Sequence, residues 1–185
     1  DLHAAIEAFD RAYARNDVEK YFSFYADDER STSAARDKTS LRTMNCGNEN
    51  NISQLFQKYD LIVDGCDNFT TRYLVNNYAI KLNKILVGGA LNQFDGQIFT
   101  ITKDSPCYSC IFPHQPNADS SDSCERVGIL GTTAGVIGLM QAMEVVKIIL
   151  GIGENLIGKI QIIDTLNNTH KIFKTSKDKN CKICS

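Results

Sequence analysis

The chain from residue 59 onward shows the hydrophobic pattern of a buried sheet. An apolar run at 61–63 leads into Asp64, a helical pattern follows over 69–82, and a second apolar run lies at 85–87. Strand, helix and strand at this spacing indicate a βαβ unit, in which the two strands are parallel and buried. We therefore predict a parallel strand pair joined by a crossover helix.

Later segments extend the predicted sheet. Residues 97–102 alternate apolar and polar positions, which is typical of a strand with one exposed face. Two further strands are predicted at 159–163 and 171–174, with a turn at 166–169. The helix at 133–150 is apolar nearly all round, so we expect it to pack in the interior. The predicted fold class is α/β: a mixed, largely parallel Rossmann-like sheet with helices on both faces.

The first sixty residues differ in character from the rest. They contain one glycine, Gly47, whereas the remaining residues contain eleven. Residues 2–26 have an amphipathic helical pattern, interrupted by the capping pair Asn16 and Asp17, and residues 31–50 are polar without a period. We predict two parts: an N-terminal helical segment and junction at 1–50, of foreign origin, and a domain at 51–185.

Composition narrows the function classes. The 185 residues are 43% hydrophobic, which is enough for a core, and the net charge of −2 offers no basic surface for nucleic acid. The N-terminus lacks the pattern of a secretory signal. The most apolar stretch, 134–150, carries Gln141, Glu144 and Lys147, which makes it a poor membrane span. We expect a cytoplasmic protein with neither a nucleic-acid nor a membrane partner.

Four of the seven cysteines form two CxxC pairs, Cys107 with Cys110 and Cys181 with Cys184. In a reducing compartment such pairs indicate metal ligands before disulfides, and two pairs complete a closed tetrahedral zinc site. We predict a structural Zn²⁺ that ties the end of the chain to a mid-chain loop. A redox CxxC is the alternative; we disfavour it because neither pair is predicted to open a helix, where a thiolate would be stabilised.

Asp67 and Asn68 follow the predicted strand at 61–63, where ligands of open α/β sheets bind. A carboxylate there can hold Mg²⁺ and so organise a triphosphate. The alternative is that Asp67 or Asn68 simply caps the helix at 69–82.

Cys124 lies in a polar segment near Arg126, which could lower its pKa and make it a nucleophile. The alternative is an incidental loop thiol. Cys66 follows a buried strand and is predicted to be a small core residue.

Several segments together resemble the ThiF/MoeB/HesA family, whose members are similar to the adenylation domain of ubiquitin-activating enzymes. The resemblance runs from about residue 53 to residue 185, through "YDLIVDGCDNFTTRYLVNNYAI", "VGGALNQFDGQI", "PCYSC", "GILGTTAGVIGLMQAMEVVKIILG", "GKIQIIDT" and "CKIC". The first thirty residues resemble instead the start of a SnoaL-like α+β fold.

The family resemblance implies an ATP-dependent adenylyltransferase. Its members activate the C-terminal glycine of a small ubiquitin-like sulfur carrier as an acyl-adenylate, and sulfur then displaces AMP, for molybdopterin or thiamine biosynthesis. Carried over by motif, Asp67 is the Mg-ATP aspartate, with Asn68 beside it. The four paired cysteines are the zinc ligands, and Cys124 is the crossover-loop cysteine. The resemblance also implies a homodimer.

One family feature is missing from this sequence. The family begins with a strand that feeds a Gly-x-Gly-x-x-Gly loop around the nucleotide, and residues 1–60 hold no such loop. The predicted fold thus lacks the N-terminal nucleotide-loop half. Two functions remain open. One is an adenylyltransferase, whether or not this chain is active alone. The other is a non-catalytic, zinc-stabilised docking or dimerisation module.

Overall fold

The computed structural model describes residues 41–42, 49–116 and 129–185. The chain divides into two units, residues 1–37 and residues 38–185, and all described residues belong to the second. The helices predicted within 2–26 lie outside the described residues, and the division at residue 50 stays a prediction.

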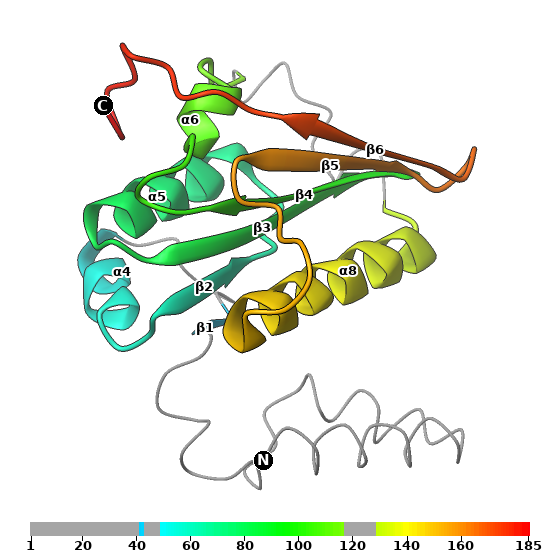
Figure 1. Ribbon diagram of the computed structural model, residues 1–185, viewed down its shortest axis with the longest axis horizontal. Helices are drawn as coiled ribbons and strands as arrows, with labels where there is room; N and C mark the ends of the chain where they lie inside the picture. The colour runs from blue at the N-terminus through cyan, green and yellow to red at the C-terminus, as the bar shows by residue number, and fades with distance from the viewer. Residues whose placement is uncertain (1–40, 43–48, 117–128) are drawn as a thin grey trace, which may run out of the picture. The chain divides into compact units, whose positions relative to one another are not determined.

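A six-stranded mixed sheet forms the centre of the described unit (Figure 1). The strands lie in chain order, β1 to β6; β1, β2 and β3 pair in parallel, and β3 to β6 pair antiparallel. The sheet is mixed, as predicted, but the expectation that it is largely parallel is wrong, because three of its five strand pairs are antiparallel. Their bounds are β1 Leu41–Arg42, β2 Leu61–Asp64, β3 Ile85–Asn92, β4 Asp95–Ile101, β5 Lys159–Asp164 and β6 Thr169–Lys174. The predicted βαβ unit is confirmed as β2, α5 and β3, and the predicted turn at 166–169 joins β5 to β6.

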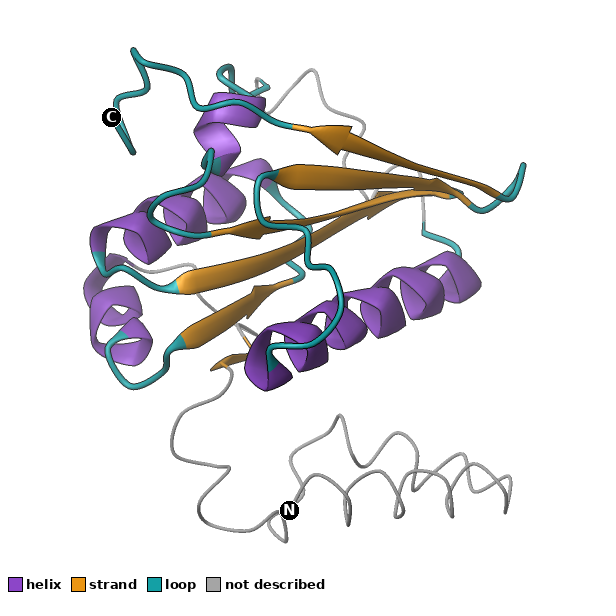
Figure 2. Cartoon of the chain, viewed as in Figure 1, coloured by secondary structure: helices purple, strands orange, loops and turns teal. Residues whose placement is uncertain are grey.

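Helices cover both faces of the sheet, as predicted (Figures 1 and 2). One face carries α4 (Glu49–Phe56) and α5 (Phe69–Lys81), and the other carries α8 (Gly131–Leu150). A short helix, α6 (Tyr108–Ile111), follows β4. The core on the α4–α5 face is the larger; its fully buried side chains are Ile52, Phe56, Ile62, Val75, Ala79, Leu86, Phe99, Ile101 and Tyr108. On the α8 face Ile137 packs with Ile98, Leu156 and Ile163.

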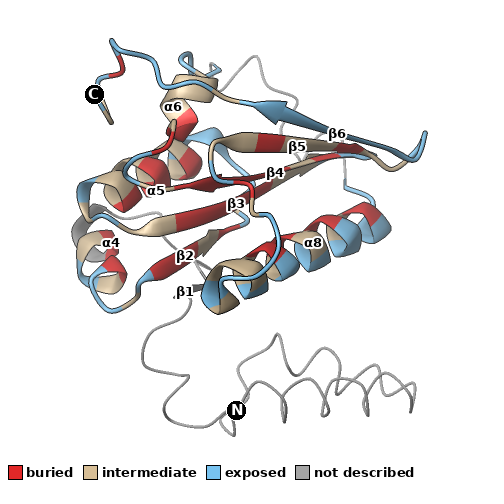
Figure 3. Cartoon of the chain, viewed as in Figure 1, coloured by how far each residue is buried: buried red, intermediate tan, exposed pale blue. Residues whose placement is uncertain are grey.

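The expectation that α8 packs wholly in the interior is wrong. One side of it, with Thr133, Ile137, Gln141 and Glu144, is buried against the sheet. The opposite side is exposed and apolar (Figure 3), and consists of Val136, Leu139, Met143, Val146 and Ile149. Composition could not distinguish these sides because both are rich in apolar residues.

By length and apolar composition α8 could cross a membrane, the one described helix that could. Its buried side nevertheless carries polar side chains that bind the sheet. Gln141 donates to the carbonyls of Asp64 (2.8 Å) and Val87 (2.9 Å), and Glu144 accepts a hydrogen bond from Thr100 (2.8 Å). Helices that cover a sheet in a globular core pass the same test of length and hydropathy.

Two glycines explain how α8 meets the sheet and where it ends. A Cβ on Gly96 of β4 would overlap the side chain of Ile137, so only glycine lets the helix approach this closely. Gly151 adopts a left-handed backbone (φ 63°) that terminates α8.

Two further expectations are corrected by the structure. Residues 31–50 were expected to be a loop, yet β1 lies within this range and α4 begins at Glu49. The strand predicted at 85–87 continues to Asn92, because residues 88–92 pair with β4 in a hairpin. The pattern missed this extension since two glycines interrupt the apolar run.

Candidate functional site

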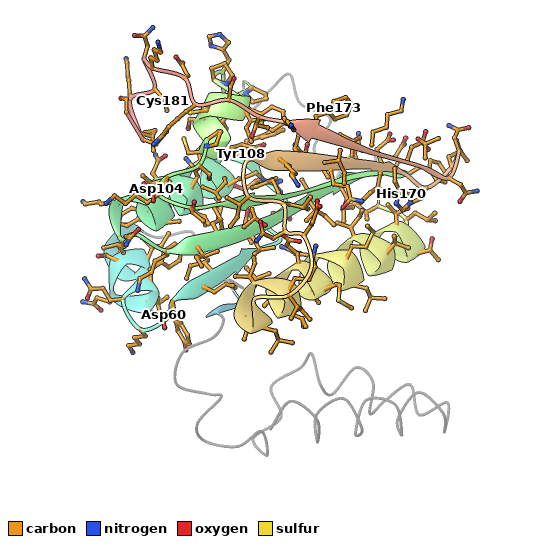
Figure 4. The ribbon with its side chains drawn as sticks, in the orientation of Figure 1. Asp60, Asp104, Tyr108, His170, Phe173 and Cys181 are labelled. Atoms are coloured by element: carbon orange, nitrogen blue, oxygen red, sulfur yellow. The ribbon has the colours of Figure 1, made fainter. Side chains whose placement is uncertain are left out.

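The four paired cysteines form one cluster, as predicted. Figure 4 labels one of them, Cys181 of the C-terminal segment. Their sulfur atoms all lie within 4.8 Å of one another, with Sγ–Sγ distances of 3.6 Å for Cys107–Cys181, 3.3 Å for Cys110–Cys184 and 3.9 Å for Cys107–Cys110. Four thiolates around a tetrahedral Zn²⁺, with Zn–S of about 2.3 Å, lie about 3.8 Å apart. The cluster therefore fits a closed four-cysteine metal centre.

Two segments far apart in the chain build this centre. Cys107 and Cys110 lie on the loop after β4 and on α6, and Cys181 and Cys184 lie on the C-terminal segment after β6. The backbone N–H of Asp178 donates to the sulfur of Cys110 (3.4 Å), which is the kind of contact that stabilises a thiolate ligand.

One premise of the sequence argument is wrong here. Cys107 occupies the N-cap position of α6, so this CxxC pair does open a helix. The helix has four residues, and Cys107 makes no capping hydrogen bond through its side chain. The metal assignment rests instead on the convergence of both pairs, which a redox CxxC does not require.

The pKa values of Cys107, Cys181 and Cys184 shift in different directions. Burial raises the pKa of Cys107 and of Cys184. Burial also acts to raise the pKa of Cys181, but hydrogen bonds from the backbone N–H groups of Ile183 and Cys184 and from the thiols of Cys107 and Cys110 outweigh it and lower that pKa to about 7.

The Asp67 loop (residues 65–68) lies at the carboxyl end of β2, as predicted. Asn68 is the N-cap of α5: its Oδ1 accepts the backbone N–H of Thr71 (2.8 Å), and its Nδ2 donates to Oδ1 of Asp67 (3.2 Å). The capping alternative thus holds for Asn68. The side chain of Asp67 is exposed, so its carboxylate can reach a ligand outside the sheet. An exposed carboxylate at this edge fits Mg²⁺, which binds proteins through one or two carboxylates and keeps several waters.

A buried charged pair lies directly beneath the Asp67 loop. Asp64 and Arg72 are 1% and 6% exposed, with Nε of Arg72 4.0 Å from Oδ2 of Asp64. Oδ1 of Asp64 accepts the backbone N–H of Cys66 (3.1 Å), and Nη2 of Arg72 donates to the carbonyl of Cys66 (2.5 Å). The Arg72 guanidinium also lies 5.9 Å from the centre of the Tyr108 ring.

Cys66 is half-buried between these charges. Burial raises the pKa of its thiol to about 12, and the nearby negative charge of Asp64 adds to the shift. Cys66 is therefore protonated at neutral pH and is no candidate nucleophile.

Helix α5 connects the Asp67 loop with the metal centre. Oδ1 of Asn76 accepts the backbone N–H of Tyr108 (2.8 Å), and the hydroxyl of Tyr73 donates to the carbonyl of Phe112 (2.6 Å). Both hydrogen bonds hold the segment around Cys107 and Cys110 against α5, the helix that begins directly after the Asp67 loop. Sequence analysis missed Arg72 and Asn76; the available signal was polar residues four apart in a helix predicted to pack on a buried sheet.

Cys124 lies outside the described residues. The next described residue, Ile129, forms a β-bridge with Gln93. It is followed by a groove at the start of α8. The groove has a volume of about 450 Å³ and is lined by Phe94, Leu130, Thr132, Thr133, Val136, Thr165, Leu166, Asn168 and His170. It lies where the hairpins β3–β4 and β5–β6 end.

The fold and the site together define a mixed α/β domain in which four cysteines from two distant segments converge on one candidate metal site. The chain belongs to the ThiF family, whose sequence profile matches residues 13–183.

Named relatives are identical to this chain at more than a third of the aligned positions. A "Sulfur carrier protein adenylyltransferase" of Thermus thermophilus is 38% identical over 140 residues, which cover 72% of this chain and 52% of the relative. An "Adenylyltransferase and sulfurtransferase MOCS3" of Drosophila virilis is 38% identical over 141 residues, covering 75% of this chain and 31% of the relative. The chain thus spans about half or less of the length of these relatives.

Among solved structures, the crystal structure of E. coli MccB with succinimide has a similar fold. Its TM-score is 0.63 at 16% sequence identity, over 78% of this chain and 44% of that chain. A likeness at this identity concerns the fold, which is the predicted α/β class.

Proposed function

We propose that this chain is the nucleotide- and carrier-facing part of an adenylyltransferase, which activates the C-terminal glycine of a small ubiquitin-like sulfur carrier with Mg-ATP. The observation that carries the proposal is the exposed Asp67 carboxylate, held at the carboxyl end of a parallel strand in a ThiF-family chain. That edge of an α/β sheet is where nucleotides bind. The name of the Thermus relative points to the same carrier class.

The proposed reaction is an adenylyl transfer. A carboxylate oxygen of the carrier's terminal glycine attacks the α-phosphorus of ATP, and the bond from that phosphorus to the leaving pyrophosphate oxygen breaks. Asp67 would hold Mg²⁺, which neutralises charge on the phosphates. A sulfur nucleophile then displaces AMP from the carrier and leaves a thiocarboxylate, as molybdopterin and thiamine synthesis both require.

In this proposal the metal centre has a structural role. Zn²⁺ bound by Cys107, Cys110, Cys181 and Cys184 has no open coordination position, so it would hold the C-terminal segment and take no part in the reaction. Reduced thiols in this number suit a cytoplasmic location.

We also propose a role for the segment that contains Cys124. Cys124 lies six positions before Leu130, a groove residue. Its thiol would attack the carbonyl carbon of the carrier adenylate, release AMP and form a thioester with the carrier.

The test is AMP transfer to a carrier that ends in Gly-Gly, followed by intact-mass spectrometry of the carrier. The zinc-loaded chain is expected to form carrier adenylate with Mg-ATP, and Asp67→Asn is expected to abolish it. Asp104→Asn is the matched control, since Asp104 is an equally exposed carboxylate distant in sequence from the loop. No adenylate from a folded, zinc-loaded chain would refute catalysis by this chain.

A second candidate is a non-catalytic docking or dimerisation module. It is favoured by the exposed apolar side of α8, which could pair two copies. AMP transfer to the carrier in the test above would rule it out.

A further inference from the structure

We propose that Asp64 and Arg72 are positioning residues, which hold the peptide before Asp67 and so aim its carboxylate at Mg²⁺. The inference rests on the proposed function for the role of Asp67, and it assigns work to two buried residues that touch no ligand. The backbone N–H of Cys66 binds Asp64, and the backbone C=O of Cys66 binds Arg72.

The two contacts clamp the backbone of Cys66 from both ends. The carboxylate of Asp64 accepts its N–H at 3.1 Å, and the guanidinium of Arg72 donates to its C=O at 2.5 Å. Hydrogen bonds with a charged partner are stronger than neutral ones, and burial excludes water that would compete with them. The carbonyl that Arg72 binds belongs to the peptide that leads into Asp67.

The clamp is itself anchored to rigid elements. Asp64 ends β2, and its carbonyl accepts a hydrogen bond from Gln141 of α8 (2.8 Å). Arg72 sits one turn into α5 and lies against Tyr108. Three elements therefore fix the position of one exposed loop, an arrangement typical of a preorganised binding site.

Burying the charged pair Asp64 and Arg72 costs free energy of folding. Oδ2 of Asp64 and Nη1 of Arg72 are buried without a hydrogen-bond partner among the described residues, and a buried pair of this kind is often less stabilising than apolar residues of the same volume. Holding a peptide in one conformation is a use that explains the pair.

The first experiment measures ATP affinity by titration calorimetry, with Mg²⁺ and with EDTA, on the zinc-loaded full chain. The dissociation constant with EDTA divided by the dissociation constant with Mg²⁺ is the Mg²⁺ ratio, which reports the Mg²⁺-dependent part of binding. We expect Arg72→Gln and Asp67→Asn each to lower this ratio about tenfold, which is the size of one charge-assisted contact. Arg72→Lys keeps the charge and one donor, so it should retain part of the ratio.

A double-mutant cycle separates positioning from a structural role. If Arg72 acts through Asp67, Arg72→Gln in the Asp67→Asn background should change the ratio by less than twofold. Independent, multiplying effects would overturn the proposal. Equal losses of affinity with Mg²⁺ and with EDTA would also overturn it, since they mean a general structural defect.

The second experiment needs no nucleotide, so it separates this inference from the proposed function. Amide hydrogen exchange of Cys66 and Asp67 should become at least about tenfold faster in Arg72→Gln, while amides of the β4–β5 pairing stay unchanged. If the wild-type chain shows no Mg-ATP binding, the proposed function fails while faster exchange still supports the clamp. Unchanged exchange at these two amides would refute the clamp itself.

Discussion

Replacing Cys181 by serine tests the metal centre, on which the C-terminal segment depends. Cys181 is buried, and its sulfur lies 3.6 Å from that of Cys107. Serine keeps the volume of the side chain but is a poor ligand for Zn²⁺, which prefers thiolate and imidazole in closed structural sites. We expect Cys181→Ser to lose its zinc and to loosen the segment from residue 175 to the C-terminus.

The size of the effect follows from the ligand count. Structural zinc sites contribute roughly 10–16 kcal/mol of apparent binding free energy, so one of four thiolates accounts for about 3 kcal/mol and loss of the whole ion for more. In a chain of this length a loss of about 3 kcal/mol already lowers Tm by about 6–12 °C, which is the least that we expect. The attachments of this segment besides the metal are few: β6 is exposed along its length, and Ile183 packs against the core only partly.

The assay combines zinc content by elemental analysis with thermal unfolding before and after a chelator. The wild-type chain should carry one zinc per chain and lose stability when the metal is removed. Cys66→Ser is the matched control, since Cys66 is half-buried and lies outside the cluster. It should keep its zinc.

The reasoning fails if Cys181→Ser retains the zinc content of the wild type, or if both proteins show the same Tm with and without chelator. Zinc loss from the Cys66→Ser control would equally contradict the assignment of ligands.

Four other predictions concern the remaining site and the core. Alkylation of Cys66 near pH 8 should be about a thousandfold slower than that of an ordinary thiol, because its pKa is raised from 9.0 to about 12; peptide mapping measures this. The pKa of Cys66 is higher in the folded chain than in the unfolded chain. The stability that its neutral thiol contributes is therefore present below pH 9 and lost as the pH rises toward 12. Cys66→Ser should accordingly flatten the dependence of Tm on alkaline pH. Glu144→Ala should destabilise the fold by about 3 kcal/mol in denaturant unfolding, because Glu144 is buried, pairs with Lys147 at 2.5 Å and accepts the N–H of Leu156 at 2.5 Å; a loss below about 1 kcal/mol would contradict this. Gly96→Val should push Ile137 and α8 off the sheet, and an unchanged Tm would show that the close approach is unimportant.

Much of the fold could be predicted from local patterns. Strands β2, β5 and β6 and helix α5 lie where short apolar runs and a helical period with a capping residue placed them. The metal centre was predictable because CxxC spacing is a strong chemical signal. A cap at Asp67 or Asn68 was the alternative to a role in Mg²⁺ binding, and the structure shows the capping hydrogen bond of Asn68.

What sequence could not show depends on tertiary packing. Helix α4 was missed because its eight residues carry three apolar positions, Ile52, Leu55 and Phe56, in one half of the helix, which is too short to establish a period. The exposed side of α8 was missed because both sides of the helix are apolar, and only the packed structure shows which side faces the sheet. Arg72 was missed because its role depends on Asp64, eight positions earlier and on another element.

Carrier-dependent pyrophosphate exchange tests the central claim most directly. The zinc-loaded chain is incubated with Mg-ATP, labelled pyrophosphate and a carrier that ends in Gly-Gly, and label entering ATP is measured. The proposed function predicts exchange that requires both the carrier's terminal carboxylate and Asp67. Exchange that is absent with a folded, zinc-loaded chain, or that persists in Asp67→Asn, would contradict it.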